Sequence, residues 1–139
     1  MSGVERALDL PHARSRAWAL MAVRISRVPA TEELIGLVKR GLKDPNKKVR
    51  GYAVRALMGL DVPEERCREE FAPLLSAMLF DKSRSVRHFV TRLGEMYPLE
   101  LVISARAREK DPVIRDRLEK IAERIAEHRL ASDGIAPVK

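Results

Sequence analysis

The sequence predicts an all-α protein, an α-α superhelix of about four antiparallel helix pairs. Two observations predict this fold. Apolar residues recur at three- and four-residue spacing along most of the 139 residues, and no window alternates for long enough to propose a sheet. The segment at residues 44–50 also returns at residues 81–87 with its aspartate, valine and arginine in register. Because a repeated helix pair covers only part of its own apolar surface, neighbouring pairs must stack on it.

The repeat extends in both directions from these two copies. A contracted copy ends at Arg115 and a degenerate one ends at Arg16, so four units of about 28–37 residues fill the chain. We therefore expect a single domain over residues 1–130, followed by a frayed tail over residues 131–139.

In the second unit, Thr31 is expected to cap a helix over residues 32–43. Asp44 and Pro45 then turn the chain into a second helix over residues 46–60. Helical spacing predicts the buried face of that second helix, which consists of Val49, Ala53, Ala56, Leu57 and Leu60.

In the third unit, Asp61 is expected to cap a first helix that continues to Phe80, where Asp81 ends it. Pro73 should kink this helix rather than end it, because periodic apolar residues continue beyond the proline. The buried face of the next helix is predicted to consist of Val86, Val90, Leu93 and Tyr97.

The last unit is predicted to hold one helix over residues 99–108 and another over residues 112–130. The buried face of the second of these helices is predicted to consist of Ile114, Leu118, Ile121 and Ile125.

An aspartate and an arginine recur around the turns. We expect them to cap the turns and to pair between neighbouring units rather than to bind a ligand. They are Asp44, Asp81 and Asp111, and Arg50, Arg87 and Arg115.

The turn within each unit carries the most specific motif. An Asp-Pro turn, a Val-Arg pair that opens the second helix and a glycine near its end (Gly59 and Gly94) together resemble HEAT repeats, over about residues 4–130. The resemblance implies a right-handed stack of helix pairs whose second helices line a concave surface and hold another macromolecule. It implies no reaction.

Charge and composition restrict the class of partner and the location that we expect. Lysine and arginine number 27 against 20 acidic residues, which gives a net charge of +7 and predicts an acidic partner. No apolar run approaches the roughly 18 residues of a membrane-spanning helix, so no membrane partner is expected. The first residues show no secretory signal, so we expect a cytoplasmic protein. The absence of glutamine, with a single asparagine, is typical of a thermophile.

Equivalent positions in successive units predict the site. Three aromatic residues stand two positions after the repeated arginine, and in two units an arginine follows three residues later, where it can lie over the ring. Further cations come just before the second helices. The predicted partner-binding residues of this basic concave groove are Trp18, Lys47, Lys48, Tyr52, Arg55, Arg84, Phe89 and Arg92. The alternatives are rings that fill spaces between helices and charges that form a solvated face.

The sequence offers no residues for catalysis, a cofactor or a metal. Cys67 is the only cysteine, and the three histidines lie far apart. Iron-dependent hydroxylases of HEAT-like build need repeated His-Glu pairs, and none occurs here. Alkylbase DNA glycosylases of HEAT-like fold have a larger array, and no acid lies in the predicted groove. We therefore expect no enzyme activity and no cofactor.

These observations predict a non-catalytic adaptor or scaffold that binds an acidic macromolecule through the basic groove. The partner is expected to be a protein, and nucleic acid or a ribonucleoprotein at the same groove is the alternative. The chain is expected to be a monomer or to self-associate weakly, with end-to-end assembly through its terminal helices as a further alternative.

Overall fold

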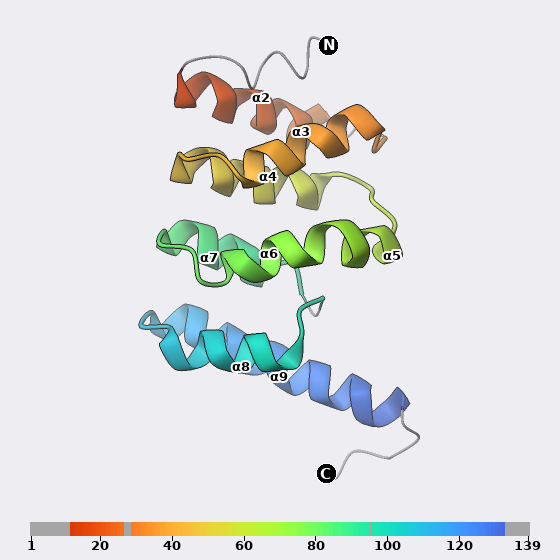
Figure 1. Ribbon diagram of the computed structural model, residues 1–139, viewed down its shortest axis with the longest axis vertical. Helices are drawn as coiled ribbons and strands as arrows, with labels where there is room; N and C mark the ends of the chain where they lie inside the picture. The colour runs from red at the N-terminus through yellow and green to blue at the C-terminus, as the bar shows by residue number, and fades with distance from the viewer. Residues whose placement is uncertain (1–11, 27–28, 95, 133–139) are drawn as a thin grey trace. The chain divides into compact units, whose positions relative to one another are not determined.

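A computed structural model describes residues 12–26, 29–94 and 96–132 (Figure 1). Over these residues the protein is all-α, as the sequence predicts. None of the described helices is long and apolar enough to cross a membrane.

The chain divides into two compact units, each larger than one sequence repeat: the first unit is Met1–Leu75 and the second unit is Ser76–Lys139. Their stacking into a superhelix stays a prediction, as does the single domain over residues 1–130. The described helices, in order, are α2 (Ala13–Ser26), α3 (Glu32–Leu42), α4 (Lys47–Gly59), α5 (Glu64–Arg66), the π-helical turn η1 (Cys67–Phe71), α6 (Ala72–Met78), α7 (Arg84–Thr91), α8 (Leu99–Arg108) and α9 (Pro112–Ser132).

Side-chain caps set the starts of α3 and α4. The Thr31 hydroxyl accepts a hydrogen bond of 3.2 Å from a backbone N–H in the first turn of α3. The Asn46 carboxamide oxygen does the same for α4 at 2.9 Å, and the Asp44 carboxylate accepts from the Asn46 N–H and so holds the turn between the helices. The Thr31 cap and the helices predicted over residues 32–43 and 46–60 are confirmed to within a residue.

A glycine lets α3 pack closely against α2 and α4. A Cβ atom added to Gly41 would lie 2.8 Å from Leu20 Cδ1 and 2.9 Å from the Ala53 Cβ, closer than carbon atoms approach unless something shifts. Leu20 and Ala53 are both fully buried. The predicted buried face of α4 is confirmed, and its members are Val49, Ala53, Ala56, Leu57 and Leu60.

The expectation that Asp61 caps the next helix is wrong. α5 begins at Glu64, directly after Pro63, and no side chain caps it. Because a residue before proline disfavours helical conformation, Val62 stays outside the helix and the helix begins only after Pro63. Asp61 instead forms an isolated parallel bridge with Pro29.

The π-helical turn η1 joins α5 to α6. The Ala72 N–H donates to the Cys67 carbonyl, five residues back rather than four. This widened turn lies just before Pro73, which has no N–H to donate and whose ring would crowd the carbonyl four residues earlier. The helical run continues through Pro73, as predicted, and its irregularity is this π-turn.

In the second compact unit, Ser76–Lys139, the helix α7 is shorter than predicted. Val86 and Val90 are buried on its face, but the helix ends after eight residues and Gly94 adopts a φ of 86°, which glycine tolerates best. Leu93 and Tyr97 therefore lie beyond the helix. Tyr97 is buried all the same, and its hydroxyl donates to the Val90 carbonyl at 2.6 Å, so the following segment supplies this core residue.

α8 has the predicted bounds, and α9 begins where predicted. α9 continues two residues into the predicted tail, and residues 133–139 lie outside the described residues. Ile125 is only half-buried, because the predicted apolar face is covered along the first part of α9 alone. The buried members are Ile114, Leu118 and Ile121.

Each repeated arginine closes the turn before its own helix. Arg50 Nη1 donates to the carbonyls of Asp44 and Pro45, both at 3.0 Å. Arg87 makes the same two bonds to its own turn at 2.8 and 3.2 Å, and Arg115 makes one at 3.0 Å. These bonds satisfy carbonyls of the turn between the two helices.

Acids at the turns pair with an arginine of the preceding repeat. Arg16 donates through Nε and Nη2 to the two carboxylate oxygens of Asp44, at 2.8 and 3.1 Å. Arg87 does the same with Glu109, at 2.8 and 3.2 Å. Arg87 therefore pairs between neighbouring repeats, as predicted for the repeated arginines, and the same pairing for Arg50 and Arg115 stays a prediction.

A charged network ties η1 to α3. The Glu70 carboxylate accepts from the Lys39 ammonium at 2.6 Å and from the Arg66 guanidinium, which also pairs with Glu32. These hydrogen bonds, that from Arg66 above all, lower the pKa of Glu70 from its usual 4.5 to about 2.

The two glycines of α3 should respond oppositely to alanine. Gly41→Ala is expected to destabilise the protein by about 1–3 kcal/mol, because the new Cβ overlaps buried Leu20 and Ala53. Gly36→Ala meets nothing within 4 Å and should stabilise it by about 0.5–1 kcal/mol through helix propensity. Urea unfolding of both variants measures the two changes. Equal effects of the two substitutions would contradict the close approach at Gly41.

Acid should remove the contribution of Glu70 to stability. Because its pKa is lower in the folded state, the contribution is complete above about pH 4.5 and is lost as the pH falls to about 2. The difference in melting temperature between wild type and Glu70→Gln should shrink across this window. Glu69→Gln removes the same charge at an exposed neighbouring position and is the control. A wild-type advantage that stays constant through the window would argue against the network.

Candidate partner-binding pocket

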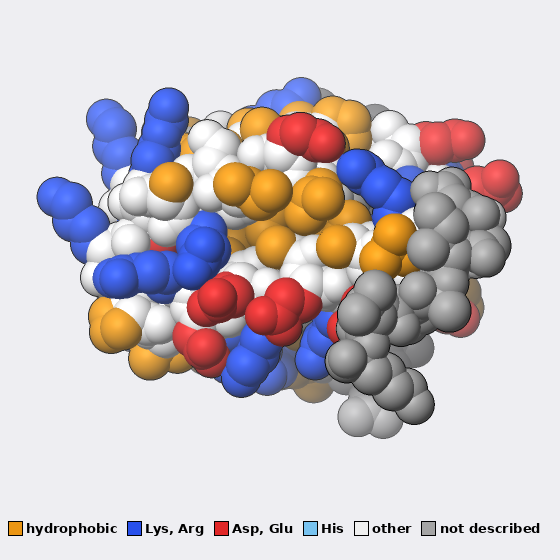
Figure 2. Space-filling view, turned by 90° about the horizontal axis from the view of Figure 1, so that it is seen from below, with side chains coloured by type: hydrophobic (Ala, Val, Ile, Leu, Met, Phe, Trp, Pro, Cys, Tyr) orange, Lys and Arg blue, Asp and Glu red, His pale blue; other side chains and the backbone are white. Residues whose placement is uncertain are grey.

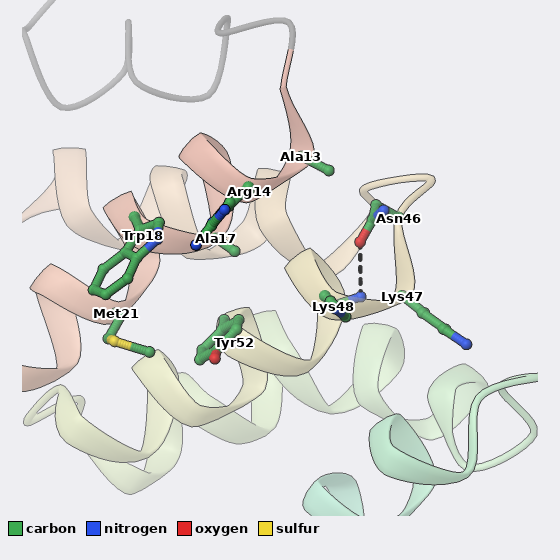
Figure 3. Close-up of a pocket in the computed structure, with 9 residues that line it drawn as sticks. All are labelled: Ala13, Arg14, Ala17, Trp18, Met21, Asn46, Lys47, Lys48 and Tyr52. Carbon is green, nitrogen blue, oxygen red and sulfur yellow. Dashed lines mark hydrogen bonds between the residues drawn. The ribbon is translucent and has the colours of Figure 1, made fainter.

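A pocket of about 590 Å³ lies between α2 and α4 in the first unit (Figure 3). Cationic side chains contribute to it from both helices, namely Arg14, Lys47 and Lys48, and none of the described lining residues is acidic. Asn46 is the remaining polar lining residue. The apolar lining consists of Ala13, Ala17, Trp18, Met21 and Tyr52.

α2 presents small side chains to the pocket. Ala13, Ala17 and Met21 recur every four residues and so share one stripe of the helix, where the alanines leave space beside α4. Leu20 lies about 200° around the helix from Trp18, so it points into the contact with α3 while Trp18 lines the pocket.

The two aromatic rings differ in exposure. Trp18 is 59% exposed, whereas Tyr52 is half-buried, and Figure 3 shows Trp18 beside Met21 at one end of the pocket, with Tyr52 between Met21 and Lys48. The exposure of Trp18 contradicts the alternative in which this ring fills an internal space. The Arg55 guanidinium lies 5.5 Å from the centroid of the Tyr52 ring, the contact that their spacing predicts.

The cations of the pocket occupy positions that helices disfavour. Lys47 and Lys48 lie in the first turn of α4 and Arg14 in that of α2, and neither turn contains an acid. The positive end of a helix dipole favours acids here by about 0.3–1 kcal/mol per charge. α3 follows that preference with Glu32 and Glu33. A placement that costs stability in this way indicates a role outside folding.

Asp44, in the turn that leads into α4, is an acid close to the pocket in sequence, but its carboxylate is bonded to Arg16 and to the Asn46 N–H. Burial opposes its ionisation, but the hydrogen bonds from Arg16 and from the Asn46 N–H hold the pKa of Asp44 below its usual value. Its carboxylate is therefore charged and already bonded, so it leaves the positive charge of Lys47 and Lys48 available to a partner.

Three predicted residues belong to the second unit. Arg84 pairs with Asp111, so its charge has a partner within the fold. Phe89 is half-buried and meets His88 edge-on, with the ring centroids 5.7 Å apart. Arg92 is exposed at the end of α7. The five residues of the first unit meet at the pocket or its edge, and one groove formed by all eight stays a prediction.

Five pocket residues are absent from the predicted set. They are Ala13, Arg14, Ala17, Met21 and Asn46. Alanine carries no chemical signal of its own, so only its four-residue spacing with Met21 marks a common stripe. Asn46 has the sequence signature of a helix cap, which it also is.

Two features of the described residues bear on catalysis, the grouping of potential metal ligands and the state of the Cys67 thiol. No group of three or more His, Cys, Asp or Glu residues among them could hold a metal ion. Burial, together with the charges of Glu64 and Glu70, raises the pKa of the half-buried Cys67 thiol. A raised pKa lowers the thiolate fraction, so its surroundings do not activate Cys67 as a nucleophile.

Apolar side chains also remain exposed on α8 and α9. Ile103 and Val113 are about half exposed, and Leu101 is partly so. Figure 2, seen from below, shows hydrophobic side chains gathered on the face it presents, with both basic and acidic side chains around them. A following helix pair would cover such a surface in a stacked array. Self-association itself stays a prediction.

No protein-family model, curated protein or solved structure matches this chain. The likeness to HEAT repeats therefore rests on the turn residues and helix pairs described above.

Alanine substitutions on α2 should separate the pocket from the core. Trp18→Ala is expected to cost less than about 1 kcal/mol, because the ring is mostly exposed. Leu20→Ala, two residues on, should cost about 2–5 kcal/mol because Leu20 is fully buried. Urea unfolding followed by circular dichroism measures both. A cost for Trp18→Ala as large as that for Leu20→Ala would make Trp18 a packing residue.

Proposed function

We propose that the chain is a non-catalytic, HEAT-like repeat adaptor that binds an acidic macromolecule at the α2–α4 pocket. One observation carries this proposal: three cations and no acid line an apolar pocket that contains an exposed tryptophan. Desolvated aromatic rings supply much of the binding energy at protein interfaces, and complementary charge speeds and orients the encounter.

The turns support the HEAT-like part of the proposal. Arg50 and Arg87 bond in the same way to the carbonyls of their own turns, so two repeats share one local design. Repeats of this kind serve as frames that present surfaces to partners, and here the surface that combines cations with an exposed ring is the pocket.

The exposed ring also favours a second candidate function, the binding of single-stranded nucleic acid. Trp18 offers a face on which a base can stack, and Lys47 and Lys48 can contact phosphates. Both candidates need the same cations, so one pair of substitutions tests the site for either partner.

Reversing two charges should abolish binding and leave the fold intact. Lys47→Glu with Lys48→Glu places acids in the first turn of α4, where the helix dipole favours them, so the melting temperature should stay the same or rise. Retention of the partner from an extract of the source cells, with and without nuclease, should fall at least about tenfold.

The matched control is Lys82→Glu with Lys110→Glu. Both lysines are exposed in the second unit, and the change in net charge is the same. The control should retain the partner. Equal loss in both double variants would indicate attraction to net charge alone, and full retention by the Lys47/Lys48 variant would remove the pocket as the site.

A further inference from the structure

We propose that the occupant of the α2–α4 pocket is an acidic protein segment that inserts one large apolar side chain and places its carboxylates against the cations. This inference rests on the proposed function, since it names the partner class for the same pocket. Four features of the pocket support it.

The lining of the pocket changes along its two helices. Arg14 and Lys48 lie in the first turns, whereas Trp18, Met21 and Tyr52 lie one to two turns further on. Figure 3 shows Lys47 and Asn46 toward one end and Trp18 and Met21 toward the other. A ligand that fits should therefore carry negative charge that reaches Lys47 and Arg14, and an apolar group that reaches Trp18 and Met21.

The helix rise gives the separation between the cations and the apolar residues. Four residues, as from Arg14 to Trp18 or from Lys48 to Tyr52, span about 6 Å, and the seven from Arg14 to Met21 span about 10 Å. An extended peptide advances about 3.3 Å per residue. Carboxylates about two to three residues from the apolar side chain match the pocket.

The apolar end suits an aliphatic or aromatic side chain better than a nucleobase. Polar atoms on a buried base edge need hydrogen-bonding partners. Ala17 and Met21 offer none, so the Trp18 indole N–H and the Tyr52 hydroxyl are the hydrogen-bonding groups that the lining provides at this end, fewer than the polar atoms of a base. A Leu, Ile, Phe or Trp side chain from a partner buries no such atoms.

The cations are spread along the pocket rather than gathered at one end. Figure 3 shows Lys47 toward one end, Trp18 toward the other, and the Arg14 side chain between them beside Ala17. An acidic segment that carries more than one carboxylate can contact both Lys47 and Arg14 while one apolar side chain lies against Trp18 and Met21.

Selection from unbiased pools tests the inference with the full chain. A library of short random peptides and a pool of random single-stranded RNA are each selected on three proteins: wild type, the Lys47→Glu/Lys48→Glu variant and the Lys82→Glu/Lys110→Glu control. We expect wild type and control to enrich peptides with acids about two to three residues from a large apolar residue. The Lys47/Lys48 variant should not enrich them.

One enriched peptide is then synthesised and titrated against Trp18 fluorescence, which is specific because the chain has a single tryptophan. Binding should shift the emission to the blue as the ring loses water. Replacing the apolar residue by serine, or the acids by their amides, should each weaken binding at least about tenfold. Trp18→Ala should weaken it comparably, with binding then followed by a label on the peptide.

Three outcomes would overturn the inference. Enrichment of acidic peptides without an apolar anchor would reduce the pocket to an electrostatic surface. Enrichment of RNA alone, dependent on Lys47 and Lys48, would replace the peptide by nucleic acid and leave the proposed function standing. If neither pool is enriched on the wild type, the inference of a peptide is wrong. The proposed function is wrong as well only if the Lys47/Lys48 variant still retains the partner from the cell extract.

Discussion

The bidentate ion pair between Arg16 and Asp44 is the constraint on which the first unit depends. Arg16 lies in the first part of α2, and Asp44 lies in the turn that leads into α4, so the pair sets the beginnings of the two helices side by side. Arg50 closes the same turn from within α4. The presence of Arg14, Lys47 and Lys48 around one pocket follows from this arrangement, because they lie close to the paired residues in the sequence.

Small residues serve two opposite purposes around α2. Gly41 of α3 removes a side chain where Leu20 and Ala53 already fill the space, and the result is close contact. Ala13 and Ala17, on another side of α2, remove side chains where no described helix of the first unit fills the space, and the result is a pocket. Small side chains thus allow close helix packing on one side of α2 and leave space for a pocket on another.

What could be predicted from the sequence is what depends on local spacing. The helices, the Thr31 cap and the contact of Arg55 with Tyr52 involve residues a few positions apart, so their geometry is set once the helix is. The pocket itself needs two helices brought together, and its alanines have no chemical signature. α7 ends early at Gly94, and the Tyr97 hydroxyl beyond it donates to the Val90 carbonyl. Tyr97 is spaced from Val90 as a residue on the same helix face would be, so the apolar periodicity could not show that it lies outside the helix.

The π-turn at Cys67–Phe71 determines how this helix accommodates its length. A turn closed by a bond across five residues holds one residue more than an α-helical turn, so it absorbs a single inserted residue without breaking the run. An insertion into a regular helix would instead rotate every later side chain by about 100° and expose buried Phe71 and Leu75. The π-turn therefore accommodates one extra residue in this helix while Phe71 and Leu75 stay on the buried face.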